Sequence, residues 1–443
     1  MNPFRSASWF AAAAANACLG LLVAQNRPAI VGLEPAHLQS RVDAVKTTQL
    51  VVRFDMDMDP KLHSLCGGGP SFPKVLRTGW RDARTFVVDV ELGWNTVYSM
   101  DLACPGSSGF RSQAGGMLAP TPWRIATRGE PLPPGDGALA AKLLFEGVSD
   151  QYSYRDRLGI DWNELERTFH DDMVNAADGP ALALLVTEVL STAQDPHITV
   201  RWEECTLPSW RRPVVANIDL RSVQTVFPKL ARVGKTALSG RTDDGIGYLY
   251  VPTFAREQRE EFDRLLETLR GMLDCKALIL DVRTNGGGDE MLARRLAAFF
   301  VKGDKVYAGH RVRDPKAPGG FREVEQRSLR GNPEPDVYAR PVAVLMGSLN
   351  MSSCEAFLLM MKQAPQAILV GEKSYGSSGN PVSHTLIPGL TVMLPSWQAL
   401  LPDGSMFEGE GIEPHIHVET KPETLATEDP VLDEALLRLR GQR

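Results

Sequence analysis

The sequence has few cysteines for its length, 6 in 443 residues, and they are scattered along the chain. This number is too small for a disulfide-rich scaffold, and the cysteines lack the close pairs typical of a zinc site. Basic residues are not in excess either, because 48 Lys and Arg stand against 54 Asp and Glu, for a formal net charge of −6. Nucleic-acid-binding proteins usually have a basic surface, so the composition argues against a nucleic-acid partner.

Long apolar runs are also missing. The apolar segment near the N-terminus is short and is interrupted by Asn16, so a membrane-spanning helix of ~20 residues fits it poorly. Residues 1–25 instead combine Arg5 with an alanine-rich apolar stretch and small residues, as a secretory signal peptide does. We therefore predict a periplasmic or secreted protein. Membrane attachment would come only through an uncleaved leader or through a lipid anchor on Cys18.

The remaining composition is that of a globular protein, with 43% hydrophobic and 23% charged residues. At roughly 150 residues per domain, the length predicts about three domains. The pattern along the chain divides it into six segments: a signal peptide (1–25), an all-β domain (31–130), a Pro- and Gly-rich linker (131–137), a helical region (138–200), an α/β core (201–420) and a C-terminal helix (421–443).

The segment 31–130 alternates apolar and polar residues, as in Leu50, Val52 and Phe54, and this period of two predicts half-buried strands. Its short motifs resemble those of bacterial Ig-like modules, which implies an Ig-like sandwich. Cys66 and Cys104 both lie in this segment. In an oxidising compartment they could form a disulfide, and the alternative is two buried thiols.

Helical periodicity begins after the linker, and from residue 245 strands alternate with helices, which predicts an α/β layer architecture. The expected helices contain Leu139–Val148, Trp162–Phe169 and Ala181–Leu190, followed later by Met291–Phe300, a helix from Ser352, and Pro430–Arg440. The expected buried strands are Gly247–Val251, Ala277–Val282, Pro341–Met346 and Ala367–Val370.

Two segments of the core follow buried strands and carry groups suited to chemistry. The run Gly286-Gly287-Gly288 exposes backbone N–H groups that could stabilise an oxyanion, and it lacks the Gly-Lys-Ser/Thr ending of a phosphate loop. Ser352 stands at the start of a helix with Glu355 three residues later. Taken alone, this pair favours a helix-capping box, and the alternative is that Ser352 is a nucleophile at a helix N-terminus.

Two further segments hold the partners that a serine nucleophile needs. His197, in Asp195-Pro196-His197, could act as the base, since the pKa of histidine lies near neutrality. Glu408, in a glutamate- and glycine-rich turn, could orient the histidine as the acid of a triad does. Taken singly, each of these residues fits a loop or turn role equally well.

Together, and in this order, the four segments resemble the serine peptidase family that includes C-terminal processing proteases, tricorn core protease and the retinoid-binding proteins of the photoreceptor matrix. The resemblance covers residues 138–440. It is carried by Asp281, Arg283, Asn285, Gly287 and Gly288 in an Asp-x-Arg-x-Asn-x-Gly-Gly pattern, by Ser352 three residues before Glu355, and by Gly411-Ile412-Glu413-Pro414. The family resemblance implies a crotonase/ClpP-like spiral of ββα units.

The departures from the family pattern indicate a branch within it. Processing proteases place a lysine base after Phe-Gly, and Ser377 occupies that position here, with Lys373 nearby. The tricorn-like branch uses a histidine and a glutamate instead, which match His197 and Glu408. Tricorn members also use a serine just before the histidine, and here that residue is Pro196.

The sequence thus predicts a serine peptidase with a triad of Ser352, His197 and Glu408. The oxyanion hole would use the N–H groups of Gly287 and Ser353, with Gly286 as the alternative to Gly287. The reading requires no cofactor and no metal, and the expected partner is a peptide or protein substrate. The rival interpretations are a non-catalytic peptide- or small-ligand-binding protein on the same scaffold and a cell-envelope assembly protein.

Overall fold

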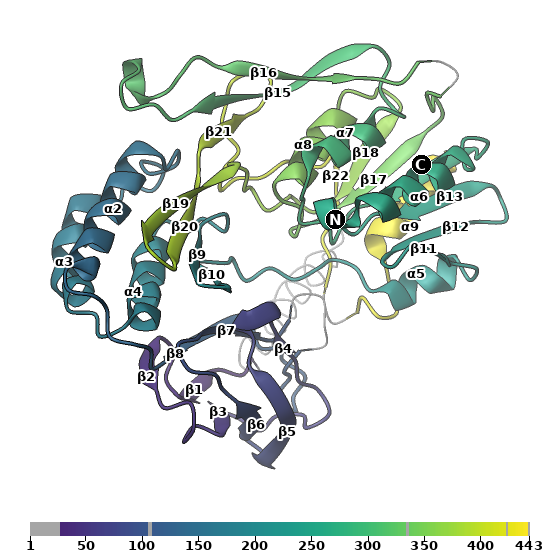
Figure 1. The fold of residues 1–443 in the computed structure, drawn as a ribbon. Helices are drawn as coiled ribbons and strands as arrows, with labels where there is room; N and C mark the ends of the chain where they lie inside the picture. The colour runs from purple at the N-terminus through teal and green to yellow at the C-terminus, as the bar shows by residue number, and fades with distance from the viewer. Residues whose placement is uncertain (1–26, 105–108, 334–335, 422–423, 442–443) are drawn as a thin grey trace, which may run out of the picture.

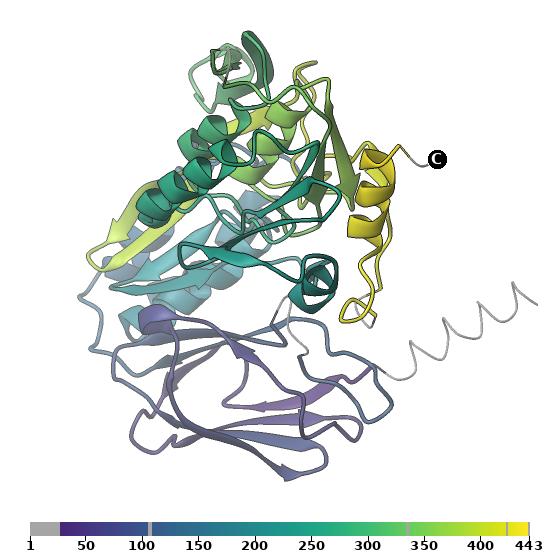
Figure 2. The same cartoon turned by 90° about the vertical axis from the view of Figure 1, so that its right-hand side faces the viewer.

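The computed structural model describes residues 27–104, 109–333, 336–421 and 424–441. The predicted signal peptide and Cys18 lie outside these residues. Within them, no helix has both the length and the apolar character needed to cross a membrane. Figures 1 and 2 show a β-domain, three helices beside it and a larger α/β core.

The β-domain consists of two four-stranded sheets that share one apolar core. Leu50, Val52 and Phe54 are at most 2% exposed, so the predicted inward positions are confirmed. The Ig-like identity of this sandwich stays a prediction. One sheet has the order β1 (Ile30–Glu34), β3 (Gln49–Phe54), β6 (Thr85–Glu91), β5 (Lys74–Asp82), and the other has the order β2 (Gln39–Val42), β8 (Thr121–Thr127), β7 (Val97–Leu102), β4 (Leu65–Cys66).

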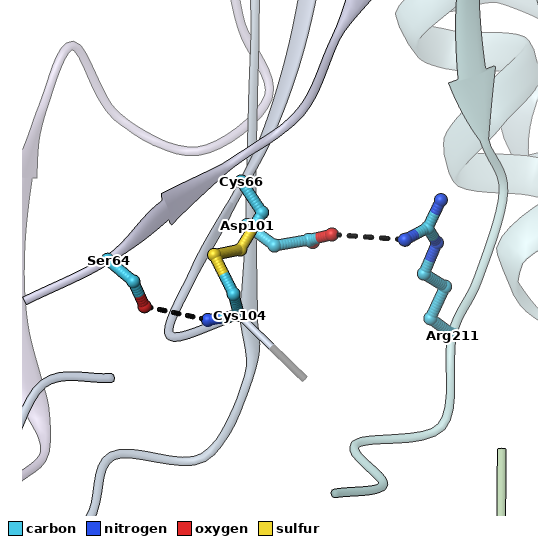
Figure 3. The surroundings of a disulfide bond; sticks show 5 residues. All are labelled: Ser64, Cys66, Asp101, Cys104 and Arg211. Atoms are coloured by element: carbon cyan, nitrogen blue, oxygen red, sulfur yellow. Dashed lines mark hydrogen bonds and ion pairs between the residues drawn. A yellow bond between two sulfur atoms is a disulfide. The ribbon is translucent and has the colours of Figure 1, made fainter. Parts of the chain in front are cut away.

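A disulfide joins Cys66 of β4 to Cys104, which follows β7, with 5.5 Å between the two Cα atoms. Of the two alternatives for these cysteines, the structure therefore has the bridge. Close to it, Asp101 forms an ion pair of 3.4 Å with Arg211, which lies 110 positions later in the chain and outside the β-domain (Figure 3). The disulfide thus lies beside the surface where the β-domain meets the rest of the protein.

The β-domain packs directly on the segment that follows His197. Ser71, at the end of the short 3-10 helix η1 (Gly69–Ser71), accepts a hydrogen bond from Thr206 N at 2.6 Å. Trp202 Nε1 donates to Asn95 O at 3.1 Å. Val97 belongs to the same buried cluster as the apolar residues of the helical region. The β-domain and the helical region therefore form one continuous packed body.

The helical region consists of α2 (Asp136–Asp150), α3 (Trp162–Val174) and α4 (Gly179–Ser191), which confirms the three predicted helices. Two of them begin at aspartates whose side chains accept a backbone hydrogen bond, Asp161 from Glu164 N and Asp178 from Ala181 N. These helices cover a four-stranded sheet that the sequence did not predict. Its order is β10 (Cys205–Pro208), β9 (Thr199–Trp202), β20 (Leu390–Pro395), β19 (Pro381–Ile387).

The core contains a seven-stranded sheet, of which the last five strands are parallel. Apolar residues of α6 (Arg259–Arg270), α7 (Glu290–Ala297) and α8 (Ser353–Met361) pack on one face, and those of α5 (Leu220–Val226) and α9 (Pro430–Leu439) pack on the other. The predicted α/β layering is thus confirmed, and the crotonase/ClpP-like identity stays a prediction. The order of the strands is β11 (Ala231–Val233), β12 (Ala237–Arg241), β13 (Ile246–Tyr250), β14 (Ala277–Asp281), β17 (Val342–Met346), β18 (Ala367–Gly371), β22 (Ile416–His417).

Two features of the core differ from the expectation. The helix expected over Met291–Phe300 ends at Ala297, because the carbonyls of Ala298 and Phe299 accept hydrogen bonds from Asn332 and Tyr338 of a later loop. The sequence also did not predict the three-stranded arm seen above the helices in Figure 1. The arm has the order β16 (Glu325–Arg330), β15 (Asp304–Val312), β21 (Trp397–Leu400), and the remaining short 3-10 turns are η2 (Arg256–Gln258) and η3 (Pro318–Gly320).

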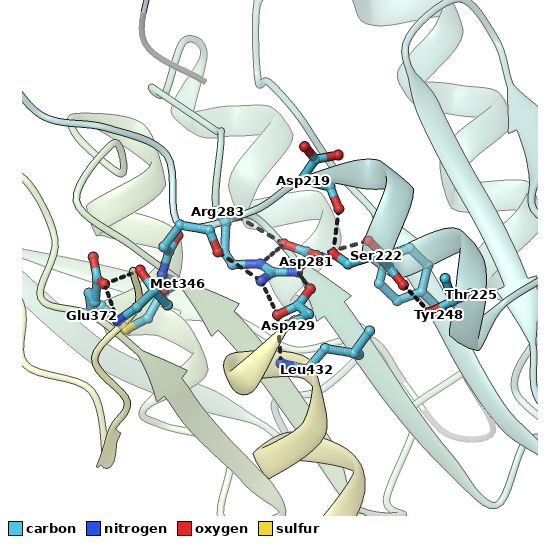
Figure 4. A network of polar contacts seen from close by, with 12 residues as sticks. Asp219, Ser222, Thr225, Tyr248, Asp281, Arg283, Met346, Glu372, Asp429 and Leu432 are labelled. Atoms are coloured by element: carbon cyan, nitrogen blue, oxygen red, sulfur yellow. Dashed lines mark hydrogen bonds and ion pairs between the residues drawn. The ribbon is translucent and has the colours of Figure 1, made fainter. Parts of the chain in front are cut away.

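A buried ionic network fastens the last helix to the sheet (Figure 4). Arg283, which is fully buried, pairs with Asp281 at 2.7 Å and with Asp429 at 2.7 Å. Asp429 is the N-cap of α9, and Tyr248 of β13 donates its hydroxyl to Asp281 at 2.8 Å. The Asp-x-Arg part of the sequence signature is therefore structural, because it joins two strands and α9.

Candidate active site

Ser352 connects β17 to α8 in a conformation that non-glycine residues rarely adopt. Its φ is 57° and its ψ is −128°, and its side chain makes no capping hydrogen bond to the helix. The capping interpretation of Ser352 is therefore not realised. Ser352 is half-buried and lines a cavity of about 520 Å³, together with Gly288, Ser353 and Arg327. Strain of this kind is costly and is often found at functional sites.

The glycine run after β14 lies directly against Ser352. Gly287 has a φ of 96°, and a Cβ atom placed on it would lie 2.9 Å from Ser352 Cβ and 2.9 Å from Ser353 N. Only glycine allows this approach without displacing backbone. Asn350 supports the same junction, because its side-chain amide donates to Asn285 O at 3.1 Å. The Asn-x-Gly-Gly part of the signature thus shapes the surroundings of the serine.

The backbone N–H groups predicted as oxyanion donors are not equally available in the structure. The N–H of Gly287 donates to Asn285 Oδ1 at 2.8 Å, so this predicted donor is already engaged inside its own turn. Gly288 and Ser353 both line the cavity, and within the described parts of the chain neither of their N–H groups has a hydrogen-bond acceptor. The Gly286 N–H likewise has no acceptor among the described residues, although Gly286 is not among those lining the cavity.

His197 reaches this region through sheet pairing. It directly precedes β9, and β9 pairs with β20, with Thr199 opposite Met393. The loop that ends at β19 then brings Ser377 to His197, with 2.7 Å between Ser377 Oγ and His197 Nδ1. The other ring nitrogen, Nε2, is buried and has no hydrogen-bond partner among the described residues.

The structure does not join His197 directly to the other predicted triad members. Between described residues, no hydrogen bond links His197 to Ser352 or to Glu408. Instead, Ser377 contacts both halves of the site, because its carbonyl accepts from Ser352 N at 2.7 Å while its hydroxyl meets His197. The carboxylate of Glu408 accepts from Ser378 N at 2.7 Å, one residue further along.

Three buried acids surround this arrangement. Burial raises the pKa of Asp195, whose carboxylate accepts from His197 N at 2.9 Å and from the Tyr152 hydroxyl at 3.1 Å. Burial also raises the pKa of Glu408 well above its ordinary value, and the nearby charge of Asp195 adds to this effect. The pKa of Glu355 is raised by burial to about 7. Burial has the opposite consequence for His197, whose pKa it lowers, because the charged form is a cation.

Lys373, the nearest lysine to the family's usual base position, is engaged at the surface. Its ammonium lies 2.9 Å from Glu413 and 3.7 Å from Glu410.

The candidate metal ligand His415 is engaged in the sheet, because its Nδ1 accepts from Leu369 N at 3.0 Å. The described residues include no group of three or more His, Cys, Asp or Glu placed to hold an ion.

The sequence analysis did not predict Ser377 as a site residue, and it used Glu355 only as a cap partner and as a marker of the family motif. The signal for Ser377 was present, because it occupies the position of the family's lysine base. Its contact with His197 joins positions 180 residues apart, and a local pattern cannot predict such a contact. Glu355 looked like a cap partner, whereas its carboxylate accepts from Ser374 Oγ, Gly376 N and Ser377 N at 2.5, 2.7 and 3.0 Å.

The core of the chain is similar in sequence to known peptidases. Residues 245–418 match the model of peptidase family S41. The chain is 26% identical over 208 residues to carboxy-terminal processing protease CtpA of Bacillus subtilis, and 25% identical over 174 residues to CtpB of the same species. These matches cover 47% and 39% of the chain, and only 41% and 34% of the length of the two relatives.

Solved structures show the same fold over a larger part of the chain. A protein from Parabacteroides merdae ATCC 43184, assigned as a peptidase, matches 68% of the chain and 96% of its own, with a TM-score of 0.59 at 21% identity. Mature CPAF matches 69% of the chain and 97% of its own, with a TM-score of 0.53 at 12% identity. At these identities the likeness concerns the fold alone.

Proposed function

Because residues 245–418 match the model of peptidase family S41, we propose that the chain is a serine peptidase of this family with Ser352 as its nucleophile. The observation that carries this proposal is the conformation of Ser352. It combines a positive φ, a side chain that does not cap its helix, and a place in the cavity wall. A serine on a strained strand-to-helix turn presents its hydroxyl for attack on a carbonyl carbon.

His197 is the proposed base. Its Nε2 is the ring nitrogen that is free of partners among the described residues, so it can take the Ser352 proton and later deliver it to the leaving amine. Burial lowers the pKa of His197, which favours the neutral imidazole, the form with a free electron pair that can accept a proton. Lys373 has no part in this mechanism, because Glu413 and Glu410 hold it at the surface.

The charges that form during the reaction have candidate stabilisers. Ser353 N–H and Gly288 N–H would bind the oxyanion, with Gly288 in place of the engaged Gly287. Glu408 remains the proposed acid of the triad. Among the described residues its carboxylate accepts from Ser378 N and has no hydrogen bond to His197, so its part would be to stabilise the imidazolium through its charge. No cofactor or metal has a step in this mechanism.

The proposed substrate is a peptide or protein, and the proposed location is outside the cytoplasm. The Cys66–Cys104 disulfide supports export, because such bridges persist in oxidising compartments. The apolar segment in residues 1–25 supports it independently.

The proposal is tested by labelling the full chain with a fluorophosphonate and mapping the modified peptide. We expect one label on Ser352, its loss in Ser352→Ala, and its retention in Lys373→Ala. Cleavage of a broad peptide library should follow the same pattern. An unlabelled parent chain that cleaves no peptide, yet binds peptides, would favour the rival interpretation of a binding protein on this scaffold.

A further inference from the structure

We propose that Ser377 is the positioning residue for His197, and that its hydroxyl selects the histidine tautomer with a free electron pair on Nε2. This inference rests on the proposed function, in which Nε2 accepts the proton of Ser352. It gives the direct contact with Nδ1 to a residue from the loop before β19, rather than to Glu408 or to a residue beside the histidine.

The contacts of Ser377 single it out. Its side chain is fully buried, and its hydroxyl oxygen lies 2.7 Å from His197 Nδ1. Its carbonyl oxygen accepts from Ser352 N at 2.7 Å. One residue thus touches both the base and the backbone of the nucleophile, so a shift of Ser377 would change the geometry between them.

Among the residues that the structure describes, no other acceptor lies within hydrogen-bond distance of Nδ1. The closest carboxylate oxygen, Asp195 Oδ1, is 3.9 Å from Nδ1, which is too far for a hydrogen bond. It is already bonded to the backbone N–H of His197. Pro196, directly before the histidine, has no hydroxyl. Ser377 is therefore the hydrogen-bond partner that decides which ring nitrogen carries the proton.

The chemical consequence follows from the neutral imidazole, which has one N–H donor and one acceptor nitrogen. When Nδ1–H donates to Ser377 Oγ, the electron pair lies on Nε2, the atom that must act as base. When the hydroxyl donates instead, the proton sits on Nε2 and the base is lost. The carboxylate of Asp195 lies 3.9 Å from Nδ1, and its negative charge favours a donating Nδ1–H at that position.

The loop that carries Ser377 is held firmly enough for this role. Glu355 Oε2 accepts from Ser377 N at 3.0 Å, and Glu355 Oε1 accepts from Gly376 N at 2.7 Å. Gly376 has a φ of 78°, and a Cβ atom there would lie 2.5 Å from Gly411 N. The carbonyl of Gly376 also accepts from Gly409 N at 2.7 Å. Bonds from α8 and from the Glu408 loop thus fix the position of the Ser377 hydroxyl.

The direct test is the tautomer of His197, read by nitrogen NMR of the full chain with isotope-labelled histidine. His197→Gln identifies the signals. At a pH where the ring is neutral, we expect the proton on Nδ1 in the parent chain and in Ser377→Thr, which keeps a hydroxyl. In Ser377→Ala we expect a mixture of tautomers or the Nε2–H form. An unchanged Nδ1–H tautomer in Ser377→Ala, or an Nε2–H tautomer in the parent, would overturn the proposal.

Kinetics provide the second readout. Ser377→Ala should lower kcat by about 10- to 100-fold with KM within about twofold, since the loss falls on proton transfer. Ser377→Thr should recover most of kcat. Ser222→Ala is the matched control, because it also removes a buried serine hydroxyl. That hydroxyl donates to Asp219 O at 2.7 Å, in a helix outside the candidate active site. Equal losses of kcat in the Ala and Thr variants would contradict the positioning role.

The two proposals fail in different ways. If Ser352 takes no fluorophosphonate label and no peptide is cleaved, the proposed function fails, and the NMR experiment still decides whether Ser377 sets the tautomer. If labelling and cleavage persist while the His197 tautomer is the same in the parent and in Ser377→Ala, the proposed function is supported and the inference about Ser377 is wrong.

Discussion

The molecule holds two groups of buried carboxylates, and they differ in how their charge is neutralised. In the first group, Asp281 and Asp429 share the guanidinium of Arg283. Burial alone would lower the pKa of Arg283, but the two aspartates raise it well above its ordinary value. In the second group, around His197, burial raises the pKa of Asp195, Glu355 and Glu408, because the cations nearby do not compensate it.

The difference separates stability from function. A buried ion pair with matched charges holds elements together and leaves no group ready to react. Acids and a histidine with shifted pKa values are costly to bury, and such groups cluster where proton transfer is needed. We therefore expect changes in the Arg283 group to act on the free energy of unfolding, and changes in the His197 group to act on rate or on the pH dependence of stability.

The largest expected effect is on catalysis. Ser352→Ala should lower peptide hydrolysis by about 10⁶-fold, and His197→Ala should cost nearly as much, because the members of a catalytic unit are not additive. The melting temperature of both variants should stay close to that of the parent. Rates and thermal unfolding measured on the same samples check this. If His197→Ala remained active while Lys373→Ala was inactive, a lysine base would replace the histidine.

Breaking the other group should act on stability. Arg283→Met leaves two buried aspartates without their cation, so it should lower the free energy of unfolding by about 3–5 kcal/mol. Denaturant unfolding followed by a core tryptophan measures the change. Arg241→Met is the control, since its ion pair with Asp274 is largely exposed and should contribute less than about 1 kcal/mol. Similar losses in the two variants would remove the contrast between buried and exposed pairs.

A pH series sharpens the comparison further. The pKa of Glu355 is raised to about 7 in the folded chain, so the native state holds this proton more tightly than the unfolded state does. Its contribution to stability is present below the ordinary glutamate pKa and is lost as pH rises through about 7. The size of the loss is about 3 kcal/mol. Unfolding free energies of the parent and Glu355→Gln between pH 4 and 8 should therefore differ in slope.

The control for this series is a carboxylate in a different setting. Glu261 accepts from Lys235 N and is paired with that lysine near the surface, so Glu261→Gln is the matched variant that removes an acid outside this site. A parent chain whose stability does not decline from pH 5 to 7 relative to Glu355→Gln would show that Glu355 titrates normally.

The smallest expected effect concerns Glu408. Glu408→Gln should lower kcat by about tenfold, because the field that favours the imidazolium is weakened while Ser377 still holds the ring. The parent rate should fall as pH drops through the His197 pKa, which burial places below 6.5. A loss as large as that of His197→Ala would mean that Glu408 contacts the ring directly during the reaction.

Local patterns predicted much of the fold, and they predicted it for a physical reason. Alternation in Leu50, Val52 and Phe54, and the buried run of Ala277–Asp281, reflect burial on one or both faces of a strand, which neighbours in sequence already record. The pairing of β9 with β20 carries no such local mark, since the two strands are separated by nearly 190 residues. The arm of β15, β16 and β21 was missed for the same reason.

The candidate site divides in the same way. Ser352 and the Asn-x-Gly-Gly turn were recognisable, because the chemistry and the backbone demands are local. Ser377 was visible only as a departure from a family pattern, since its partner His197 reaches it through the tertiary fold. The sequence predicted Gly287 as an oxyanion donor from its place in the glycine run. It could not show that the Gly287 N–H donates to Asn285 Oδ1.

The docking of the β-domain on β9 and β10 has a consequence for dissection of the chain. The linker over 131–137 suggests a boundary for a truncated chain. However, hydrogen bonds join residues on its two sides, because Thr206 N donates to Ser71 Oγ and Trp202 Nε1 donates to Asn95 O. Removing the β-domain would expose the apolar surface of the helical region that Val97 and Ala126 cover. It would also remove the hydrogen-bond partners of the strand that follows His197. The two regions therefore form one packed unit, and we expect a chain of residues 138–443 alone to aggregate or to lose the position of His197.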